Sequence, residues 1–232
     1  MATLARRNSN LVEGKNVLLS EEITIFLFDC SSSMYGSIMD DGSFNLSGIC
    51  STKFNAMKQA AIKFVEQRMN AIRNGASDSV GIITFGDQVK MLHDPSFQNF
   101  ENLISKLNRM HCSGSTPMAQ AVDLAIQTAE RFSSGMIRVV ICSDGQPDYK
   151  DSVLHNVRRG FDDYGIIFDT VGIGDPNDRW GLDEDFLKLV AEIGGGEYTL
   201  ISTFQDFQRK LLSIEGERQL LLGTGILMLP GK

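Results

Sequence analysis

A carboxylate and two hydroxyls follow an apolar run near the start of the chain, within the segment Ile23–Met34. Asp29 is followed at alternate positions by Ser31 and Ser33. The residues just before Asp29 are apolar or β-branched, which is typical of a strand buried on both faces of a parallel sheet. Because an unpaired carboxylate is costly in a core, we expect Asp29 at the carboxyl end of this strand, where open parallel sheets form their ligand crevice.

These oxygen-bearing side chains suit a hard divalent cation. Mg²⁺ prefers oxygen ligands and keeps several waters, so a few side-chain oxygens and solvent are enough for a site. Hydroxyls carry no charge, so a metal bound by Ser31 and Ser33, with Asp29 bound through water, would keep most of its positive charge for an acidic group from outside. The alternative interpretation is that Asp29 caps the next turn and the serines are ordinary loop residues.

Two later segments also carry oxygen-bearing side chains at the ends of predicted elements: one precedes a helix and the other follows a strand. Thr116 precedes Pro117 at the start of an apolar-periodic helix, so it is either the N-cap of that helix or a hydroxyl that faces the crevice. Gly114 permits a close approach of the backbone in the same loop. A buried strand over Met136–Cys142 is followed by a second carboxylate, Asp144, within a turn-rich segment.

Hydrophobic periodicity predicts strands that alternate with amphipathic helices. The strands are expected at 23–28, 80–85, 88–92, 136–142, 166–173 and 198–201, and the helices over 54–69, 97–110, 118–132, 152–163, 183–193 and 203–214. This order predicts an α/β fold with a doubly wound, mostly parallel six-stranded sheet, one antiparallel edge strand and helices on both faces. Right-handed crossovers would bring the strand ends to one rim, where the candidate ligands converge: Asp29, Ser31, Ser33, Thr116 and Asp144.

The length of 232 residues fits one large domain. We expect a lead-in over residues 1–20, the domain over 21–216 and an apolar tail over 217–232. The tail could form a hairpin on the domain or dock a partner. Its longest apolar run, Leu220–Pro230, is about half of the ~20 residues that span a bilayer, so no membrane span is expected.

Charge and cysteine content exclude further classes of protein. The net charge of −7 argues against a nucleic-acid partner. No apolar core follows the arginines at 6–7, so a secretory signal is not recognised and a cytoplasmic location is expected. The four cysteines have the spacing of neither a disulfide framework nor a zinc site, and we expect them to be reduced: Cys30, Cys50, Cys112 and Cys142.

Together these motifs resemble the von Willebrand factor type A domain and its metal-ion-dependent adhesion site. The resemblance covers about residues 20–216: Asp-x-Ser-x-Ser after the first strand, Thr after a Gly-containing loop, and Asp-Gly after the fourth strand. It implies that Ser31 and Ser33 bind the metal directly. Asp29 and Asp144 would act directly or through water, and Thr116 would join or leave the coordination as the site changes state.

The resemblance implies a metal-dependent protein-binding module and not an enzyme. Mg²⁺ is the expected ion, with Mn²⁺ and Ca²⁺ as alternatives, and a Glu or Asp of the partner protein would complete the octahedron. Intracellular members work beside AAA+ ATPases or in gene clusters with kinases and phosphatases, so these are the partner classes it suggests. Two departures bear on access: Ser32 stands where the family often has Gly, and an insertion over 35–52 carries Asp40 and Asp41, which could reach towards the ion.

Three other interpretations remain open. A Mg²⁺-dependent phosphohydrolase would use the same rim, but phosphatases of the haloacid dehalogenase type place a second Asp where this chain has Ser31, which removes the general acid/base. The histidines His93, His111 and His155 are scattered, and only His111 is near a rim loop. The domain could instead be a structural scaffold that binds no metal. Finally, the cysteines near the proposed ligands could form a redox switch, although free cysteine is often only a small buried apolar residue.

Overall fold

A computed structural model describes residues 22–38, 52–73, 79–96, 99–132, 135–175, 181–203, 205–206 and 209–210 of the chain. The lead-in over 1–20, the acidic pair Asp40 and Asp41, and the tail over 217–232 lie outside these residues, as do both predicted domain boundaries. Within the described ranges, no helix has the length and hydrophobicity needed to cross a bilayer.

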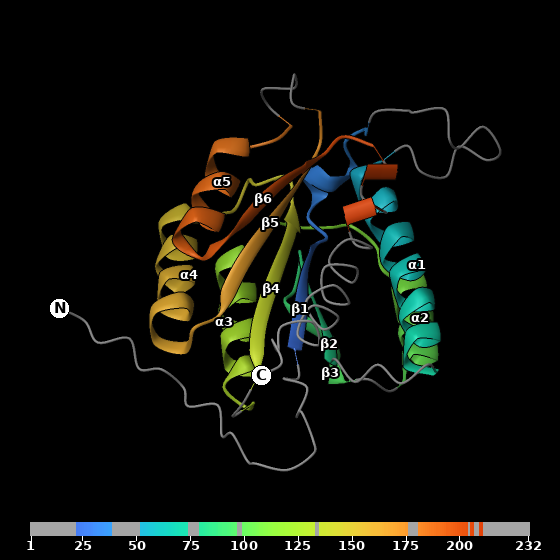
Figure 1. Cartoon of the computed structure of the whole chain (residues 1–232). Helices are drawn as coiled ribbons and strands as arrows, with labels where there is room; N and C mark the ends of the chain where they lie inside the picture. The colour runs from blue at the N-terminus through green and yellow to red at the C-terminus, as the bar shows by residue number, and fades with distance from the viewer. Residues whose placement is uncertain are drawn as a thin grey trace, which may run out of the picture.

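Six strands form one sheet in the order β3-β2-β1-β4-β5-β6 (Figure 1). Five are parallel to their neighbours and only β3 is antiparallel, pairing with β2 at the edge. The mostly parallel sheet with an antiparallel edge strand is therefore confirmed. The strands are β1 (Glu22–Asp29), β2 (Ser79–Phe85), β3 (Lys90–Ser96), β4 (Met136–Ser143), β5 (Ile167–Ile173) and β6 (Gly195–Ile201).

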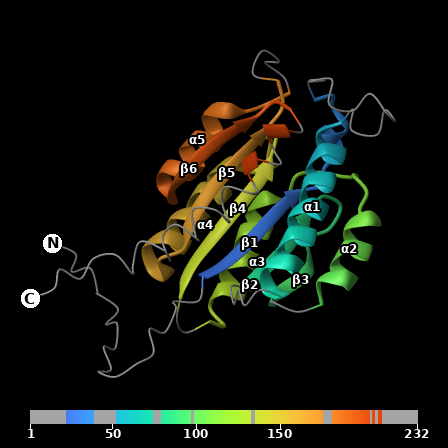
Figure 2. The ribbon, with the colours of Figure 1, turned by 45° about the vertical axis from the view of Figure 1, so that its right-hand side comes forward.

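Helices cover both faces of the sheet, as expected from the sequence (Figures 1 and 2). One face carries α1 (Lys53–Arg73) and α2 (Phe100–Asn108), and the other carries α3 (Met118–Ala129), α4 (Lys150–Tyr164) and α5 (Glu184–Ile193). A short 3-10 helix, η1 (Ser32–Tyr35), follows β1 directly.

The side chains of β1 alternate between two apolar cores because successive residues of a strand point to opposite faces. Ile25 and Leu27 pack with the helices α3, α4 and α5. Phe26 and Phe28 pack with α1 and α2. Burial on both faces explains the nearly continuous apolar run before Asp29.

Several boundaries differ from the prediction. The edge strand β3 lies at 90–96 and not at 88–92. The strand β6 begins at Gly195, whereas the glycines there predicted only a helix end. Gly195 has φ +65°, and a Cβ at Gly196 would come within 2.2 Å of the Phe168 carbonyl oxygen. The close approach of the backbone therefore requires glycine at the start of β6. Because glycine has no side chain, this part of the strand shows no hydrophobic pattern from which it could be predicted.

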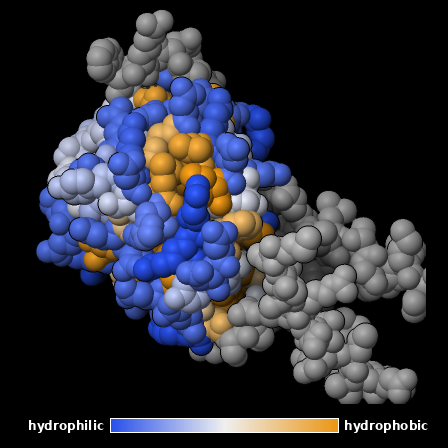
Figure 3. All heavy atoms as spheres, turned by 90° about the vertical axis from the view of Figure 1, so that its left-hand side faces the viewer, coloured by the Kyte–Doolittle hydropathy of each residue, from blue (hydrophilic) through white to orange (hydrophobic). Residues whose placement is uncertain are grey.

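The surface on the α4 and α5 side is mostly hydrophilic, with a central apolar area and smaller apolar areas near its edges (Figure 3). Large apolar side chains that are partly exposed on these two helices include Phe161 at 39% and Leu189 at 40%. Single exposed apolar residues are normal on soluble domains, so they give no reason to place a partner on this face.

Candidate metal centre

The candidate site lies where the strand order reverses. From β1 the chain proceeds to β2 and β3 on one side and to β4, β5 and β6 on the other, so the switch point falls between β1 and β4. Phe28 pairs with Cys142 in the parallel register of these strands. The next residues, Asp29 and Ser143, therefore end the two strands side by side, at the place where open α/β sheets bind ligands.

Asp29 is fully buried, and both of its carboxylate oxygens accept hydrogen bonds. The backbone N–H of Ser31 donates to Oδ1 at 2.8 Å, and the hydroxyl of Ser143 donates to Oδ2 at 2.5 Å. Burial, and then the negative charge of Asp144, raise the pKa of Asp29 to about 7. Both causes disfavour the ionised carboxylate, and a cation placed beside it would favour that form.

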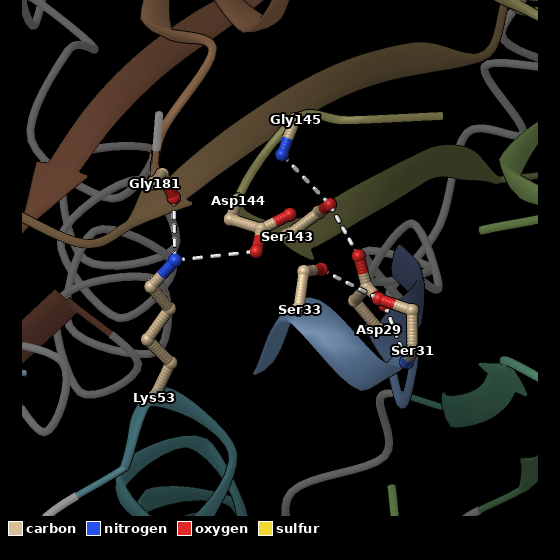
Figure 4. Close-up of polar contacts among 8 residues, drawn as sticks. All are labelled: Asp29, Ser31, Ser33, Lys53, Ser143, Asp144, Gly145 and Gly181. Carbon is tan, nitrogen blue, oxygen red and sulfur yellow. Dashed lines mark hydrogen bonds and ion pairs between the residues drawn. The ribbon is translucent and has the colours of Figure 1, made fainter. Parts of the chain in front are cut away.

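Ser31 and Ser33 place their hydroxyls together within the same loop. Their Oγ atoms lie 3.0 Å apart. Ser31 is buried and Ser33 half-buried, while Ser32 between them is exposed. The turn of η1 fixes this arrangement, because the N–H of Met34 donates to the carbonyl of Ser31 at 3.2 Å. The alternate spacing of the two serines thus brings both hydroxyls to one side, next to Asp29 (Figure 4).

Asp144 is also fully buried, but its two oxygens differ. The Nζ of Lys53 lies 3.2 Å from Oδ2 and also donates to the carbonyl of Gly181 (Figure 4). Oδ1 has no hydrogen-bond partner among the residues that the structure describes. A buried carboxylate oxygen without a partner is costly, and a cation would satisfy it.

Thr116 lies in the loop beside this cluster. It is buried, its N–H donates to Asp148 Oδ1 at 3.1 Å, and its carbonyl accepts from the N–H of Asp148 at 3.2 Å. These bonds join its loop to the loop that follows Asp144. The helix α3 begins at Met118 with Pro117 in the N-cap position and no side-chain capping bond. The interpretation of Thr116 as an N-cap is therefore wrong.

Backbone hydrogen bonds tie the loops of the rim together. The N–H of Ser32 donates to the carbonyl of Gly114 at 3.1 Å, and that of Ser113 donates to the carbonyl of Cys30 at 2.8 Å. Gly114 has φ +82°, and a Cβ there would lie 2.7 Å from the backbone nitrogen of Asp87. The close approach expected at Gly114 is confirmed, with Asp87 as the neighbour.

The structure thus groups Asp29, Ser31, Ser33 and Asp144, and places Thr116 in the adjoining loop. Two members of this cluster were not predicted from the sequence. Ser143 precedes Asp144 directly, so its position at a strand end was a signal that could have been used. Lys53 had no such signal, because it reaches Asp144 across 91 positions of the chain.

The thiols near the site are buried and unpaired. Cys30, Cys112 and Cys142 are free cysteines, as expected, and Cys50 lies outside the described residues. Burial raises the pKa of all three thiols. The thiolate is the reactive form, and a raised pKa makes it scarce. The interpretation of these cysteines as small buried apolar residues is therefore favoured over a redox switch.

A hollow of about 370 Å³ opens beside the cluster, between the end of β2, the edge strand β3 and the end of α2. Cys30 and Ser113 belong to its wall and connect it to the rim loops. Its ionisable side chains are mainly basic, although Asp87 is also present: Lys90, Lys106, Arg109 and His111.

The donor set fits a hard cation and not a soft one. Carboxylate and hydroxyl oxygens suit Mg²⁺, Mn²⁺ or Ca²⁺, whereas zinc sites use mainly His and Cys. Within the described ranges, no group of three or more His, Cys, Asp or Glu side chains is placed to hold a metal ion. The fit therefore depends on combining two carboxylates with neutral hydroxyls.

Comparison with known proteins decides the family. The sequence profile of the von Willebrand factor type A domain matches residues 24–146, which is more than half of the chain. The chain belongs to the von Willebrand factor type A domain family. Domains of this family are generally protein-interaction modules and typically not enzymes.

Individual relatives are more distant. The chain is 26% identical to the uncharacterized protein YfbK of Escherichia coli (strain K12) over 146 residues, which are 59% of this chain and 24% of that protein. The chain therefore corresponds to about a quarter of that relative.

Solved structures share the fold. BatB from Bacteroides thetaiotaomicron, a conserved hypothetical protein, has a TM-score of 0.66 and 16% identity, with 86% of this chain and 98% of that chain covered. The manganese-loaded TRAP protein of Plasmodium vivax has a TM-score of 0.59 and 15% identity, with 86% and 73% covered.

Proposed function

We propose that this domain binds a partner protein through a divalent cation. Asp29, Ser31, Ser33, Thr116 and Asp144 would hold the ion, with Mg²⁺ as the expected metal. The observation that carries the proposal is the buried Oδ1 of Asp144, which has no hydrogen-bond partner among the described residues. It lies beside a second buried carboxylate whose pKa is raised.

The charged and the neutral ligands would have different roles. Asp29 and Asp144 would supply the negative charge that retains the ion, while Ser31 and Ser33 would contribute neutral oxygens. When bound, the cation would supply a positively charged coordination position that accepts a carboxylate. The hydrogen bond from the Ser143 hydroxyl to Asp29 Oδ2 would orient the Asp29 carboxylate beside the ion.

An acidic partner agrees with the surroundings of the site. The chain as a whole carries a net charge of −7, yet the hollow beside the cluster is lined by Lys90, Lys106 and Arg109. A local positive field attracts acidic segments and speeds their association. We therefore expect the partner to present a Glu or Asp; an AAA+ ATPase, or a kinase or phosphatase module, remains the class suggested by sequence.

Manganese binding followed by electron paramagnetic resonance tests the proposal. Free Mn²⁺ gives a strong signal that falls on binding, so titration of the wild-type domain should show one site. Replacement of Asp29 or Ser31 by Ala should weaken that binding at least about tenfold, since each removes a proposed ligand. Ser105→Ala, at an exposed position of α2, is the matched control. Binding that is unchanged in D29A and S31A would contradict the proposal.

A further inference from the structure

Lys53 is a buried cation directly beside the candidate metal site. It is 4% exposed, its Nζ lies 3.2 Å from Asp144 Oδ2, and it also donates to the carbonyl of Gly181. Lysine is almost never this buried unless it is paired. The ammonium group therefore neutralises one of the two carboxylates on which the site depends.

Three segments of the chain hold this lysine in place. Its backbone N–H donates to the carbonyl of Gly36 at 2.9 Å, just after η1. A Cβ at Gly36 would lie 3.2 Å from Lys53 Cε, and a Cβ at Gly174, after β5, would lie 3.5 Å from it. The aliphatic stem thus passes close to both of these glycines. Its ammonium group then reaches Asp144 and Gly181 (Figure 4). Its position is a property of the fold and not of one flexible side chain.

The charge of the site depends on this lysine. With both carboxylates ionised, Asp29 and Asp144 would balance a divalent ion, and Lys53 would leave the loaded site with one positive charge in excess. A unit charge a few ångströms away changes the affinity for another ion at least about tenfold, even at an effective dielectric constant of about 20. The same charge should therefore repel the metal and attract a carboxylate.

We propose that Lys53 is a specificity-determining residue. Its charge lowers the affinity of the site for the metal and raises the affinity of the metal-loaded site for acidic ligands. It competes with the cation for Asp144, and it gives the loaded site the excess positive charge that a partner's carboxylate meets. This inference rests on the proposed function, since it concerns the same site.

Two variants separate charge from hydrogen bonding. Lys53→Met removes the charge and the donor, whereas Lys53→Gln removes the charge and keeps a donating N–H group. Lys63→Met makes the same charge change at an exposed position of α1, ten residues further along and about 15 Å away along the helix axis. Circular dichroism before titration verifies that each variant is folded.

The first measurement is Mn²⁺ affinity by electron paramagnetic resonance. K53M and K53Q should both bind Mn²⁺ at least about tenfold more tightly than wild type, and K63M should match wild type. The second measurement is displacement of bound water by acetate, followed by water proton relaxation of the Mn²⁺-loaded domain. Both Lys53 variants should require about tenfold more acetate, because the excess positive charge is absent.

The outcomes distinguish the two proposals. Wild-type binding of Mn²⁺ with equal or weaker binding by both Lys53 variants would overturn the role of Lys53 and leave the metal site intact. Binding by the variants but not by wild type would overturn both proposals, because the natural site would then hold no ion whose ligands Lys53 could select. Absence of binding in all four proteins would overturn both.

Discussion

The hydroxyl of Ser143 donates to Asp29 Oδ2 at 2.5 Å and joins the ends of β1 and β4 at the switch point of the sheet. The same oxygen of Ser143 accepts from the N–H of Gly145 at 3.0 Å. One side chain thus positions a buried carboxylate and fixes the turn that carries Asp144. The geometry of the candidate site therefore depends on the register between β1 and β4 as well as on the candidate ligands themselves.

Replacing Ser143 with Ala should destabilise the domain and loosen the site together. The change leaves a buried oxygen of Asp29 and the N–H of Gly145 without their partner, which costs about 1–3 kcal/mol for each unsatisfied group. Urea denaturation measures the free energy of unfolding. Ser105→Ala on the exposed face of α2 should change it by less than about 0.5 kcal/mol. Equal stability of S143A and wild type would contradict this account.

Gly114 should tolerate no side chain. Alanine there requires a left-handed backbone, which costs about 1–2 kcal/mol, and its Cβ would overlap the backbone of Asp87. Gly165 is a matched control, because it has φ +67° and, its chain neighbours aside, none of the described residues comes within 4 Å of the place that a Cβ would take. We expect G114A to lose at least about 2 kcal/mol more unfolding free energy than G165A. Similar losses of unfolding free energy in G114A and G165A would show that the backbone moves to relieve the overlap at Gly114, and would contradict this prediction.

His93 should make the stability depend on pH. Burial, followed by the positive charge of Lys106, lowers the pKa of His93 from 6.5 in the folded domain, and Asp94 offsets this only in part. The unfolded chain therefore binds a proton at this histidine first as the pH falls, so the contribution of His93 to the free energy of unfolding should decrease below about pH 6.5 until the folded-state pKa is passed. The raised pKa of Asp29 acts in the opposite direction over the same range, so the effect of His93 is measured as a difference between variants.

Comparison of variants isolates this effect. His93 packs against the ring of Phe100 and lies 3.3 Å from the hydroxyl of Ser96, so glutamine is a polar replacement of similar size. As the pH is lowered from about 7.5 to 5, the free energy of unfolding of His93→Gln should rise relative to that of wild type, measured by urea denaturation. His155→Gln, at an exposed position of α4, is the control. A constant difference between H93Q and wild type over this range would show that His93 does not contribute to the pH dependence.

Local patterns in the sequence predicted most of the fold. The apolar runs before Asp29 and Asp144 are buried strands because both faces of a parallel sheet are covered by helices. Asp183 was predicted to cap a helix, and its side chain accepts from the N–H of Phe186 at 3.2 Å at the start of α5. At the predicted capping box, the N–H of Asp206 donates to Thr203 Oγ1 at 3.2 Å, which is one of the two bonds of that motif.

Long-range contacts could not be predicted in the same way. The start of β6 depends on close packing of glycine against Phe168, and the placement of Lys53 depends on glycines far away in the chain. A lysine at the first position of an amphipathic helix normally indicates a solvated side chain. Only the assembled rim shows that Lys53 is buried and paired with Asp144.

The position of a bound ion tests the central claim most directly. Crystals grown with Mn²⁺ allow the metal to be located by its anomalous scattering. The account predicts a single strong peak at the end of β1, roughly 2.0–2.3 Å from the hydroxyl oxygens of Ser31 and Ser33. A peak elsewhere, or none at saturating Mn²⁺ in crystals that diffract well, would contradict it.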